Sequence, residues 1–154
     1  MKSILFVCTA NICRSPMAEA IFNALIEDAG LPFCVQSAGT SALRNKQMAP
    51  NAKAALEEVG VYVADHFAQQ ISETLLEEAD LVLVMNSQHA AEINRLFKNP
   101  SNKVYTLSEY SKSTKGHEDI SDPYGQSMVA YRACVRHLFD CLNPLIVRLS
   151  AEAA

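Results

Sequence analysis

The most constraining feature of this sequence is a junction between an apolar run and a helix start near the N-terminus. The run Ile4–Val7 is short and unbroken, which is typical of a strand buried on both faces of a parallel sheet. Ser15 and Pro16 are residue types preferred at the N-cap and first position of a helix. Apolar residues then recur at helical spacing, at Met17, Ile21, Ala24 and Leu25. A short loop therefore joins a buried strand to a helix N-terminus, where backbone N–H groups and the helix dipole favour a phosphate-sized anion.

The loop Cys8–Ser15, which we call the phosphate loop, also carries a nucleophile and a charge clamp. Five residues separate Cys8 from Arg14. A thiol at a helix N-terminus beside a guanidinium favours the thiolate, which is the nucleophilic form of cysteine. The guanidinium offers a planar fork that matches two phosphoryl oxygens. The alternative is a buried cysteine with a surface arginine nearby, but the strand, the spacing, Ser15 and Pro16 together favour an anion site.

The pattern C-x5-R-S at the end of the first strand resembles that of the low-molecular-weight protein tyrosine phosphatases. Further matching segments extend the likeness over nearly the whole chain: Ser37–Thr40, Ala79–Met85 and Asp122–Tyr124. The resemblance implies an α/β fold, a three-layer domain with a four-stranded parallel sheet of order 2-1-3-4 flanked by helices. It also implies hydrolysis of protein phosphotyrosine through a phosphocysteine intermediate, with no cofactor and no metal.

The composition fits one soluble domain over residues 1–154, long enough to bury about 68–70% of its unfolded surface. The net charge is −4 and no long basic run is present, so we expect no nucleic-acid partner. No apolar run approaches the roughly 18–20 residues of a membrane span, and Met1–Ser3 leaves no room for a signal peptide. We therefore expect a cytoplasmic protein with no membrane partner, either a monomer or a weak homodimer, whose partner is a phosphorylated protein substrate.

Strand and helix patterns alternate along the chain, which is typical of an α/β domain with a parallel sheet. The apolar runs predict strands at about 3–8, 33–38, 81–85 and 103–107. Helices are predicted at about 16–29, 50–60, 74–79 and 87–97, and a last one after Gly125 that runs towards Leu149. Pro144 should kink or interrupt this last helix. Residues 40–49 and 108–121 are predicted as loops.

Release of a phenolate requires an acid that protonates the leaving oxygen. From the residues alone, Asp119 and Asp122 are equally good candidates in the polar segment before the last helix. The resemblance favours Asp122, the aspartate of Asp-Pro-Tyr, and implies that the same carboxylate later activates water against the phosphocysteine.

The resemblance assigns further site residues. Substrate contacts fall on the phosphate loop and on two walls: Thr9, Ala10, Asn11, Ile12, Cys13, Ser15, Tyr124 and Leu43. Asn11, Ser37 and His66 match positions that brace the loop by hydrogen bonds, and Ser15 matches the serine bonded to the nucleophile's sulfur. Ala10 stands where the family usually has glycine, so we expect a negative φ there, whereas asparagine at position 11 tolerates a left-handed backbone.

The five cysteines follow no zinc-binding spacing. Cys13 shares the phosphate loop with Cys8, so an oxidised Cys8 is expected to be captured as a disulfide before irreversible oxidation. A small buried packing residue is the alternative for Cys13. Cys34, Cys134 and Cys141 are expected to pack as small apolar residues.

Three other functions compete with phosphotyrosine hydrolysis. An arsenate reductase on this scaffold needs two more cysteines after the third strand, and Met85–Ala90 contains none. The protein-arginine phosphatase branch resembles this chain around Gln88–His89, 103–107 and 122–125, but it carries threonine in place of Ile12. Isoleucine there is the tyrosine-specific pattern, and because this position borders the substrate we favour phosphotyrosine. The third alternative is a phosphopeptide-binding module or a redox sensor that only holds anions, but a binder would need neither Cys8 nor Asp122.

Overall fold

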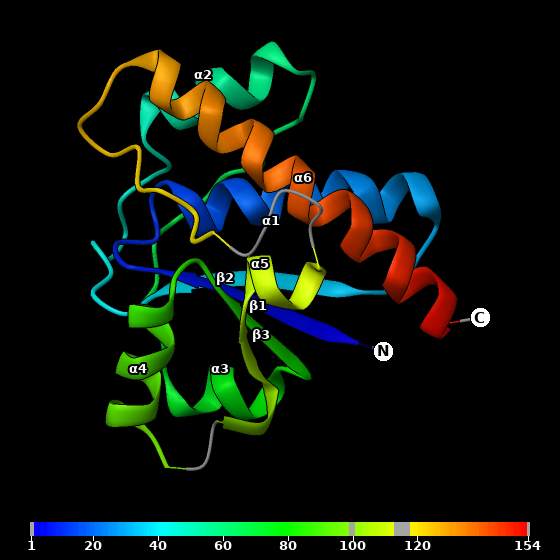
Figure 1. Cartoon of the computed structure of the whole chain (residues 1–154). Coiled ribbons are helices and arrows are strands. Elements are labelled where there is room, and N and C mark those ends of the chain that lie inside the picture. Colours follow the sequence, from blue (N-terminus) through cyan, green and yellow to red (C-terminus); the bar gives the residue numbers. More distant parts are fainter. Residues whose placement is uncertain (1, 99–100, 113–117, 154) are drawn as a thin grey trace.

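Four short parallel strands form the sheet at the centre of the chain (Figure 1). The computed structural model describes residues 2–98, 101–112 and 118–153. The strands are β1 (Ser3–Cys8), β2 (Cys34–Gly39), β3 (Leu81–Val84) and β4 (Val104–Thr106), in the order β2-β1-β3-β4. The predicted fold and strand order are thus confirmed. The two most apolar runs form the inner strands, where both faces of the sheet are covered.

Helices cover both faces of the sheet and give three layers (Figure 1). One side holds α1 (Arg14–Ala29), α5 (Leu107–Ser111) and α6 (Met128–Ala153), with α2 (Pro50–Glu58) packed outside against α6. The other side holds α3 (Glu73–Glu78) and α4 (Ser87–Leu96), and a short 3-10 turn, Ser101–Lys103, precedes β4. Among the described residues, no helix is long and apolar enough to cross a membrane.

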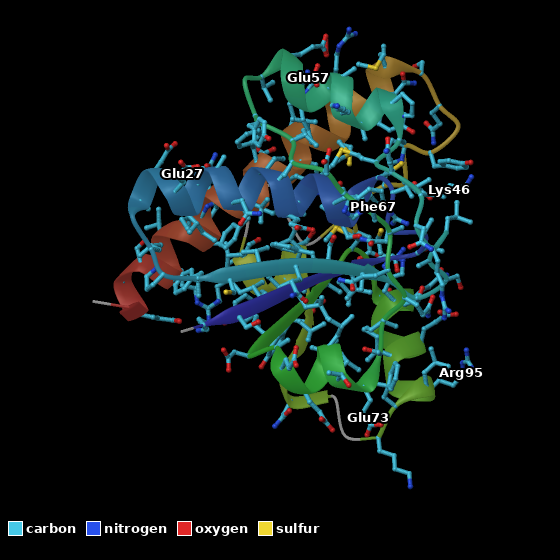
Figure 2. The ribbon with its side chains drawn as sticks, turned by 180° about the vertical axis from the view of Figure 1, so that it is seen from behind. Glu27, Lys46, Glu57, Phe67, Glu73 and Arg95 are labelled. Atoms are coloured by element: carbon cyan, nitrogen blue, oxygen red, sulfur yellow. The ribbon has the colours of Figure 1, made fainter. Side chains whose placement is uncertain are left out.

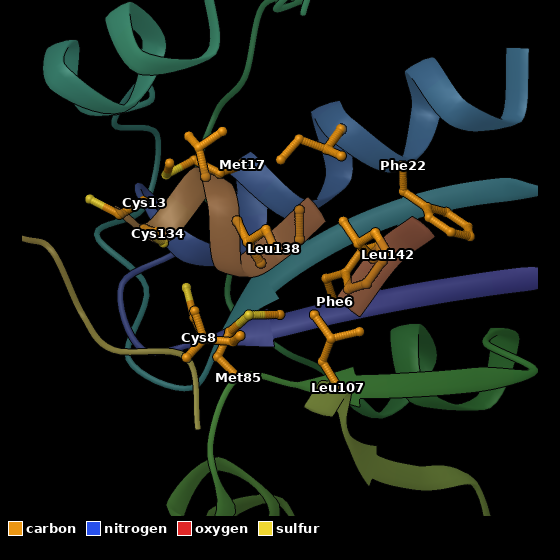
Figure 3. Packing of buried hydrophobic residues seen from close by; sticks show 14 of the residues in the cluster. Phe6, Cys8, Cys13, Met17, Phe22, Met85, Leu107, Cys134, Leu138 and Leu142 are labelled. Atoms are coloured by element: carbon orange, nitrogen blue, oxygen red, sulfur yellow. The ribbon is translucent and has the colours of Figure 1, made fainter. Parts of the chain in front are cut away.

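The larger core lies between the sheet and the pair α1 and α6. Phe6 and Phe22 meet edge to face at 5.8 Å, and Leu138 and Leu142 of α6 pack beside them (Figure 3). α6 continues through Pro144 to Ala153, so of the predicted kink or interruption, the interruption does not occur. Fully buried leucines lie on both sides of the proline, at Leu138, Leu142, Leu145 and Leu149. Their burial, about 1.5–3 kcal/mol each, offsets the roughly 3 kcal/mol cost of an internal proline.

Three local predictions differ from the structure. α1 begins at Arg14 and its N-cap is Cys13, so Ser15 is not a cap and Pro16 is not the first helical residue. The predicted loop 108–121 begins with α5, which is capped by the Thr106 hydroxyl and is too short for sequence periodicity; residues 113–117 lie outside the described part. Cys34 is exposed because it starts an edge strand, whereas Cys134 and Cys141 are buried as expected.

The carboxyl ends of the inner strands bring three sequence segments together. Cys8 at the end of β1 is paired with Gly39 at the end of β2, and Val7 is paired with Val84 of β3. Residues that follow parallel strands at such an edge are placed to form a ligand site. The phosphate loop, the segment after Gly39 and the start of α4 therefore meet at one end of the sheet.

Gly39 is required by the close approach of β2 to the phosphate loop. A Cβ at this position would lie 2.3 Å from the carbonyl oxygen of Thr9. That oxygen is held by the N–H of Ser41 at 2.9 Å, and the Gly39 N–H bonds Gln69 O at 2.9 Å. Neither backbone is free to move away.

We therefore expect Gly39→Ala to cost about 1–3 kcal/mol of the free energy of unfolding, as overpacking does, and to distort the phosphate loop. Chemical denaturation with and without inorganic phosphate measures both effects, because a ligand that binds only the folded state raises the unfolding midpoint. Gly60→Ala is the control: Gly60 has φ +77° and no neighbour within 4 Å of a Cβ. It should cost strain of about 1–2 kcal/mol and keep the phosphate effect. Normal stabilisation of Gly39→Ala by phosphate would contradict this account.

Candidate active site

The phosphate loop turns through a left-handed residue at its centre. Asn11 is fully buried with φ 60°. Its side chain donates to Ser15 Oγ at 2.8 Å and Ser37 Oγ at 3.0 Å, and accepts the Gln69 N–H at 3.0 Å. Its own carbonyl oxygen accepts from His66 Nε2 at 2.7 Å, which places the proton of that ring on Nε2. Ala10 is not among the described residues with positive φ, as expected.

The segment after β2 bonds the outer side of the phosphate loop. Backbone N–H groups of residues 40–49 donate to loop carbonyl oxygens at 2.9–3.1 Å, pairing Thr40 with Cys8, Ser41 with Thr9, Leu43 with Ala10 and Ala49 with Ile12. In the described part of the chain, the N–H groups of residues 10–13 donate to no backbone carbonyl. With the carbonyls directed outward and bonded, these N–H groups are left for an anion on the inner side.

The sulfur of Cys8 lies at the N-terminal end of α1 with hydrogen-bond donors beside it. Ser15 Oγ is 2.8 Å from Cys8 Sγ, and the Ser15 N–H points to the same atom at 3.4 Å. Because Ser15 Oγ accepts from Asn11 Nδ2, its single hydrogen is free for the sulfur or for Ala38 O at 3.4 Å. The shorter contact favours the sulfur, so the hydroxyl is placed to stabilise a thiolate.

Arg14 joins the phosphate loop to the segment that carries Asp122. Its guanidinium is buried; Nη1 donates to Ile120 O at 3.1 Å, and Nη2 lies 3.6 Å from Asp122 Oδ2. The Ile120 N–H bonds Met85 O at 2.9 Å, so this segment is tied to the end of β3. The Asp122 side chain is 51% exposed, and its Oδ1 accepts the Tyr124 N–H at 3.1 Å.

These groups line one cavity of about 160 Å³. A cavity of roughly 150 Å³ holds one benzene ring, so the space suits a single ring-sized group. Its lining residues are Cys8, Thr9, Ala10, Asn11, Ile12, Cys13, Arg14, Asp122 and Tyr124. Thiol, guanidinium and carboxylate thus face the same small space, an arrangement suited to holding an anion and attacking it.

A histidine from α4 fixes one side of this cavity. His89 Nδ1 accepts the N–H of Asn86 at 3.2 Å, so the ring carries its hydrogen on Nε2, which donates to Thr9 Oγ1 at 2.9 Å. Arg14 Nη2 approaches the same oxygen at 3.5 Å. Burial, and secondarily the Arg14 charge, lower the pKa of His89 to about 4, so the ring is uncharged at neutral pH. Thr9 therefore accepts from two N–H groups and keeps its own hydrogen for a ligand.

Comparison with known proteins identifies the family. The family model for low molecular weight phosphotyrosine protein phosphatase matches residues 3–154. The chain belongs to this family. A protein-arginine-phosphatase of Bacillus subtilis is 41% identical over 97% of both chains, and a low molecular weight protein-tyrosine-phosphatase of Streptomyces coelicolor is 38% identical over 86% of this chain and 84% of that one. The crystal structure of the low molecular weight protein tyrosine phosphatase from T. tengcongensis superposes with a TM-score of 0.90 at 34% identity, covering 96% of this chain and 99% of that one.

The fold of this low-molecular-weight phosphatase places most of the predicted site residues around one cavity. All of the predicted loop residues except Ser15 line the cavity, as do Asp122 and Tyr124, while Ser15 lies behind the sulfur. Leu43, predicted as a wall of the pocket, is exposed and does not line the cavity; its N–H donates to the Ala10 carbonyl oxygen. Asp119 is directed elsewhere, towards the Ser87 N–H at 3.5 Å. Of the two aspartates, the structure places only Asp122 at the cavity.

Sequence reasoning missed three contributors to the site. His89 Nε2 bonds the Thr9 hydroxyl oxygen, and Ile120 O accepts from the Arg14 guanidinium. Glu19 Oε1 accepts the Ser37 hydroxyl at 2.5 Å. Burial raises the pKa of Glu19, although the Ser37 bond and the nearby His66 lower it. A carboxylate three residues after Pro16, on a helix face that also buries apolar residues, was the available signal for Glu19. His89 entered the sequence analysis only as part of the likeness to the protein-arginine phosphatase branch, because its hydrogen-bond partner, Thr9, is 80 residues away.

Cys13 is buried beside the phosphatase site and its thiol lies 3.6 Å from the hydroxyl of Tyr131. Burial raises the pKa of Cys13 to about 11. Because disulfide exchange requires a thiolate, capture of an oxidised Cys8 by Cys13 should be slow at neutral pH and accelerate as the pH rises. A protective disulfide stays a prediction.

The hydrogen bonds of Thr9 predict a non-additive pair of substitutions. Thr9→Val should lower kcat/KM for phenyl phosphate about tenfold or more, because a hydrogen bond to a charged group contributes roughly 1.5–3 kcal/mol. His89→Leu should cause a similar loss, and the double variant should lose little more, since both act through one hydroxyl. His89→Gln, whose amide nitrogen stands in for Nε2, and Thr9→Ser are the matched controls that should retain activity. Fully additive losses in steady-state kinetics would contradict this role.

Proposed function

We propose that this phosphatase hydrolyses phosphotyrosine in protein substrates through a phosphocysteine intermediate. The observation that carries the proposal is the meeting of Cys8, Arg14 and Asp122 on one ring-sized cavity at the N-terminus of α1. A binding module or redox sensor requires no acid there. Segment 85–90 at the start of α4 contains no cysteine, which disfavours arsenate reduction.

In the first step, the Cys8 thiolate attacks phosphorus while the N–H groups of residues 10–13 and the Arg14 fork hold the phosphoryl oxygens. The bond from phosphorus to the tyrosyl oxygen breaks, and that oxygen takes the proton of Asp122. In the second step, the Asp122 carboxylate removes a proton from water, which attacks the phosphocysteine. The sulfur–phosphorus bond breaks and releases phosphate and the thiolate, which the Ser15 hydroxyl stabilises.

Ile12 supports a phenolic leaving group. Its side chain is 7% exposed and lines the cavity. A phosphoarginine guanidinium brings several N–H donors, and isoleucine supplies no acceptor for them. The exposed Tyr124 also lines this cavity, and contact between aromatic rings is worth about 0.5–1.5 kcal/mol beyond buried area.

Phosphoarginine hydrolysis is the second candidate. Two relatives named protein-arginine-phosphatase, from Bacillus subtilis and Geobacillus stearothermophilus, are 41% and 37% identical to this chain. We favour phosphotyrosine because the difference at Ile12 lies in the cavity itself.

A panel of phosphotyrosine, phosphoarginine and phosphoserine peptides tests the substrate. Wild type should prefer phosphotyrosine, with very little hydrolysis of phosphoserine, whose short side chain keeps phosphorus away from Cys8. Ile12→Thr should shift the kcat/KM ratio towards phosphoarginine, and a change of roughly 10–200-fold is the scale that pocket shape alone supplies. Cys8→Ser, inactive but able to bind phosphate, is the control. A wild-type preference for phosphoarginine would refute the tyrosine assignment.

The two aspartates provide a matched test of the acid. Asp122→Asn should lower kcat/KM for phenyl phosphate by about 10²–10⁴, the range for a positioned general acid. The loss should be smaller for 4-nitrophenyl phosphate, whose leaving oxygen needs less protonation. Asp119→Asn should remain near wild type. A larger loss for Asp119→Asn than for Asp122→Asn, measured by steady-state kinetics, would overturn the assignment.

A further inference from the structure

A second cleft, of about 200 Å³, opens beside the phosphate loop on the side of α4. We call it the side cleft; its lining residues are Thr9, Thr40, Ser41, Gln88, His89 and Glu92. Thr9 also lines the catalytic cavity, so the two spaces adjoin. Consecutive Cα atoms are about 3.8 Å apart. A substrate chain that inserts a phosphorylated side chain into the cavity therefore brings a nearby residue to the side cleft.

Three polar side chains of the side cleft are available to a ligand. In the described part of the chain, the side chains of Ser41, Gln88 and Glu92 form no hydrogen bond or ion pair with another protein group. The side cleft is therefore lined by one hydroxyl, one amide and one carboxylate that have no protein partner among the described residues. Polar groups at a surface that have no protein partner bond to water, and a ligand that supplies matching groups can replace this water.

Both walls of the side cleft are held in place. Gln70 donates from Nε2 to Thr40 O at 2.8 Å and accepts the Ala42 N–H at 2.9 Å, which fixes the wall from the segment after β2. The opposite wall is the first turn of α4, where Asn86 and His89 form a reciprocal capping box. A site on fixed walls binds without a large ordering cost.

The charge of the side cleft favours a cation. Glu92 is the only charged lining residue, because His89 is uncharged at neutral pH. The positive end of α4 is already occupied: the Ser87 N–H meets Asp119 Oδ2 at 3.5 Å, and the His89 N–H bonds Asn86 Oδ1 at 3.0 Å. An acidic ligand group would therefore meet the Glu92 carboxylate, whereas a cation would find in Glu92 an unpaired partner.

We propose that the side cleft binds the side chain of a lysine or arginine that lies close to the phosphorylated residue in the substrate protein. The ammonium or guanidinium pairs with Glu92 and donates to Ser41 Oγ and Gln88 Oε1. This subsite rests on the proposed function only in requiring a phosphorylated protein substrate. The enzyme then reads a phosphate and a neighbouring positive charge through adjacent sites of opposite sign.

Peptide pairs test the subsite. Phosphotyrosine peptides that differ only in lysine, alanine or glutamate at each of the two positions on either side are compared at low ionic strength. For at least one position, wild type should show kcat/KM about three- to fivefold higher for lysine than for alanine, the scale of one exposed ion pair, and lower still for glutamate. Glu92→Gln should bring the lysine-to-alanine ratio close to one. Added salt should weaken the wild-type ratio.

Glu57→Gln is the matched control, since Glu57 is an exposed carboxylate on α2, at the far end of the molecule from α4 (Figure 2). It should leave the ratio unchanged, and Glu92→Gln should leave kcat/KM for phenyl phosphate unchanged. Equal rates for lysine and alanine peptides in wild type at all four positions, or a preference that survives Glu92→Gln, would overturn the subsite. If wild type acts on phosphoarginine peptides instead, the tyrosine assignment is wrong, but the proposal for the side cleft is not affected. The same flanking series on those peptides then decides the side cleft.

Discussion

The left-handed turn at Asn11 is the constraint on which the site depends. A non-glycine residue in this conformation is strained by roughly 1–2 kcal/mol, and here it is fully buried with φ 60°. The strain is held because the side-chain amide and the carbonyl oxygen of Asn11 have four partners on three segments, at Ser15, at Ser37, and at His66 and Gln69. Leaving one such buried group unpaired costs about 1–3 kcal/mol. The bonds therefore outweigh the strain several times over.

Asn11 also fixes the direction of the hydrogen bonds that reach the nucleophile. Its amide nitrogen carries only hydrogens, so the hydroxyl oxygens of Ser15 and Ser37 both act as acceptors towards it. Each hydroxyl then has one hydrogen to donate in the opposite direction. That of Ser37 goes to Glu19 and that of Ser15 to the sulfur of Cys8. A buried amide thus directs one hydroxyl hydrogen towards the carboxyl group of Glu19 and the other towards the sulfur of Cys8.

Strands were predictable from this sequence because burial on both faces leaves uninterrupted apolar runs, as in β1 and β3. The predicted helix start was wrong because residue types that cap helices also form other hydrogen bonds: Ser15 lies within α1, and its hydroxyl contacts Asn11 Nδ2 and Cys8 Sγ. α5 has five residues, too few for a periodic signal. The nucleophile, arginine and Asp-Pro segment carry local patterns. The contact of Thr9 with His89 and the close approach of Gly39 to Thr9 have no local sequence pattern, because each joins residues that are far apart in the sequence.

The net charge of −4 does not prevent this fold from holding a phosphate dianion. Charges farther away than about 8 Å are largely screened at physiological ionic strength, so binding depends on the groups at the cavity. There the segment after β2 bonds the loop carbonyls, the N–H groups of residues 10–13 donate to no backbone carbonyl in the described part of the chain, and Arg14 is buried beside Thr9. The half-exposed Asp122 side chain lies 3.6 Å from that arginine, so solvent screens the repulsion between its carboxylate and a bound phosphate. Phosphate binding in this fold thus depends on the local groups of the phosphate loop and on Arg14, not on the sign of the net charge.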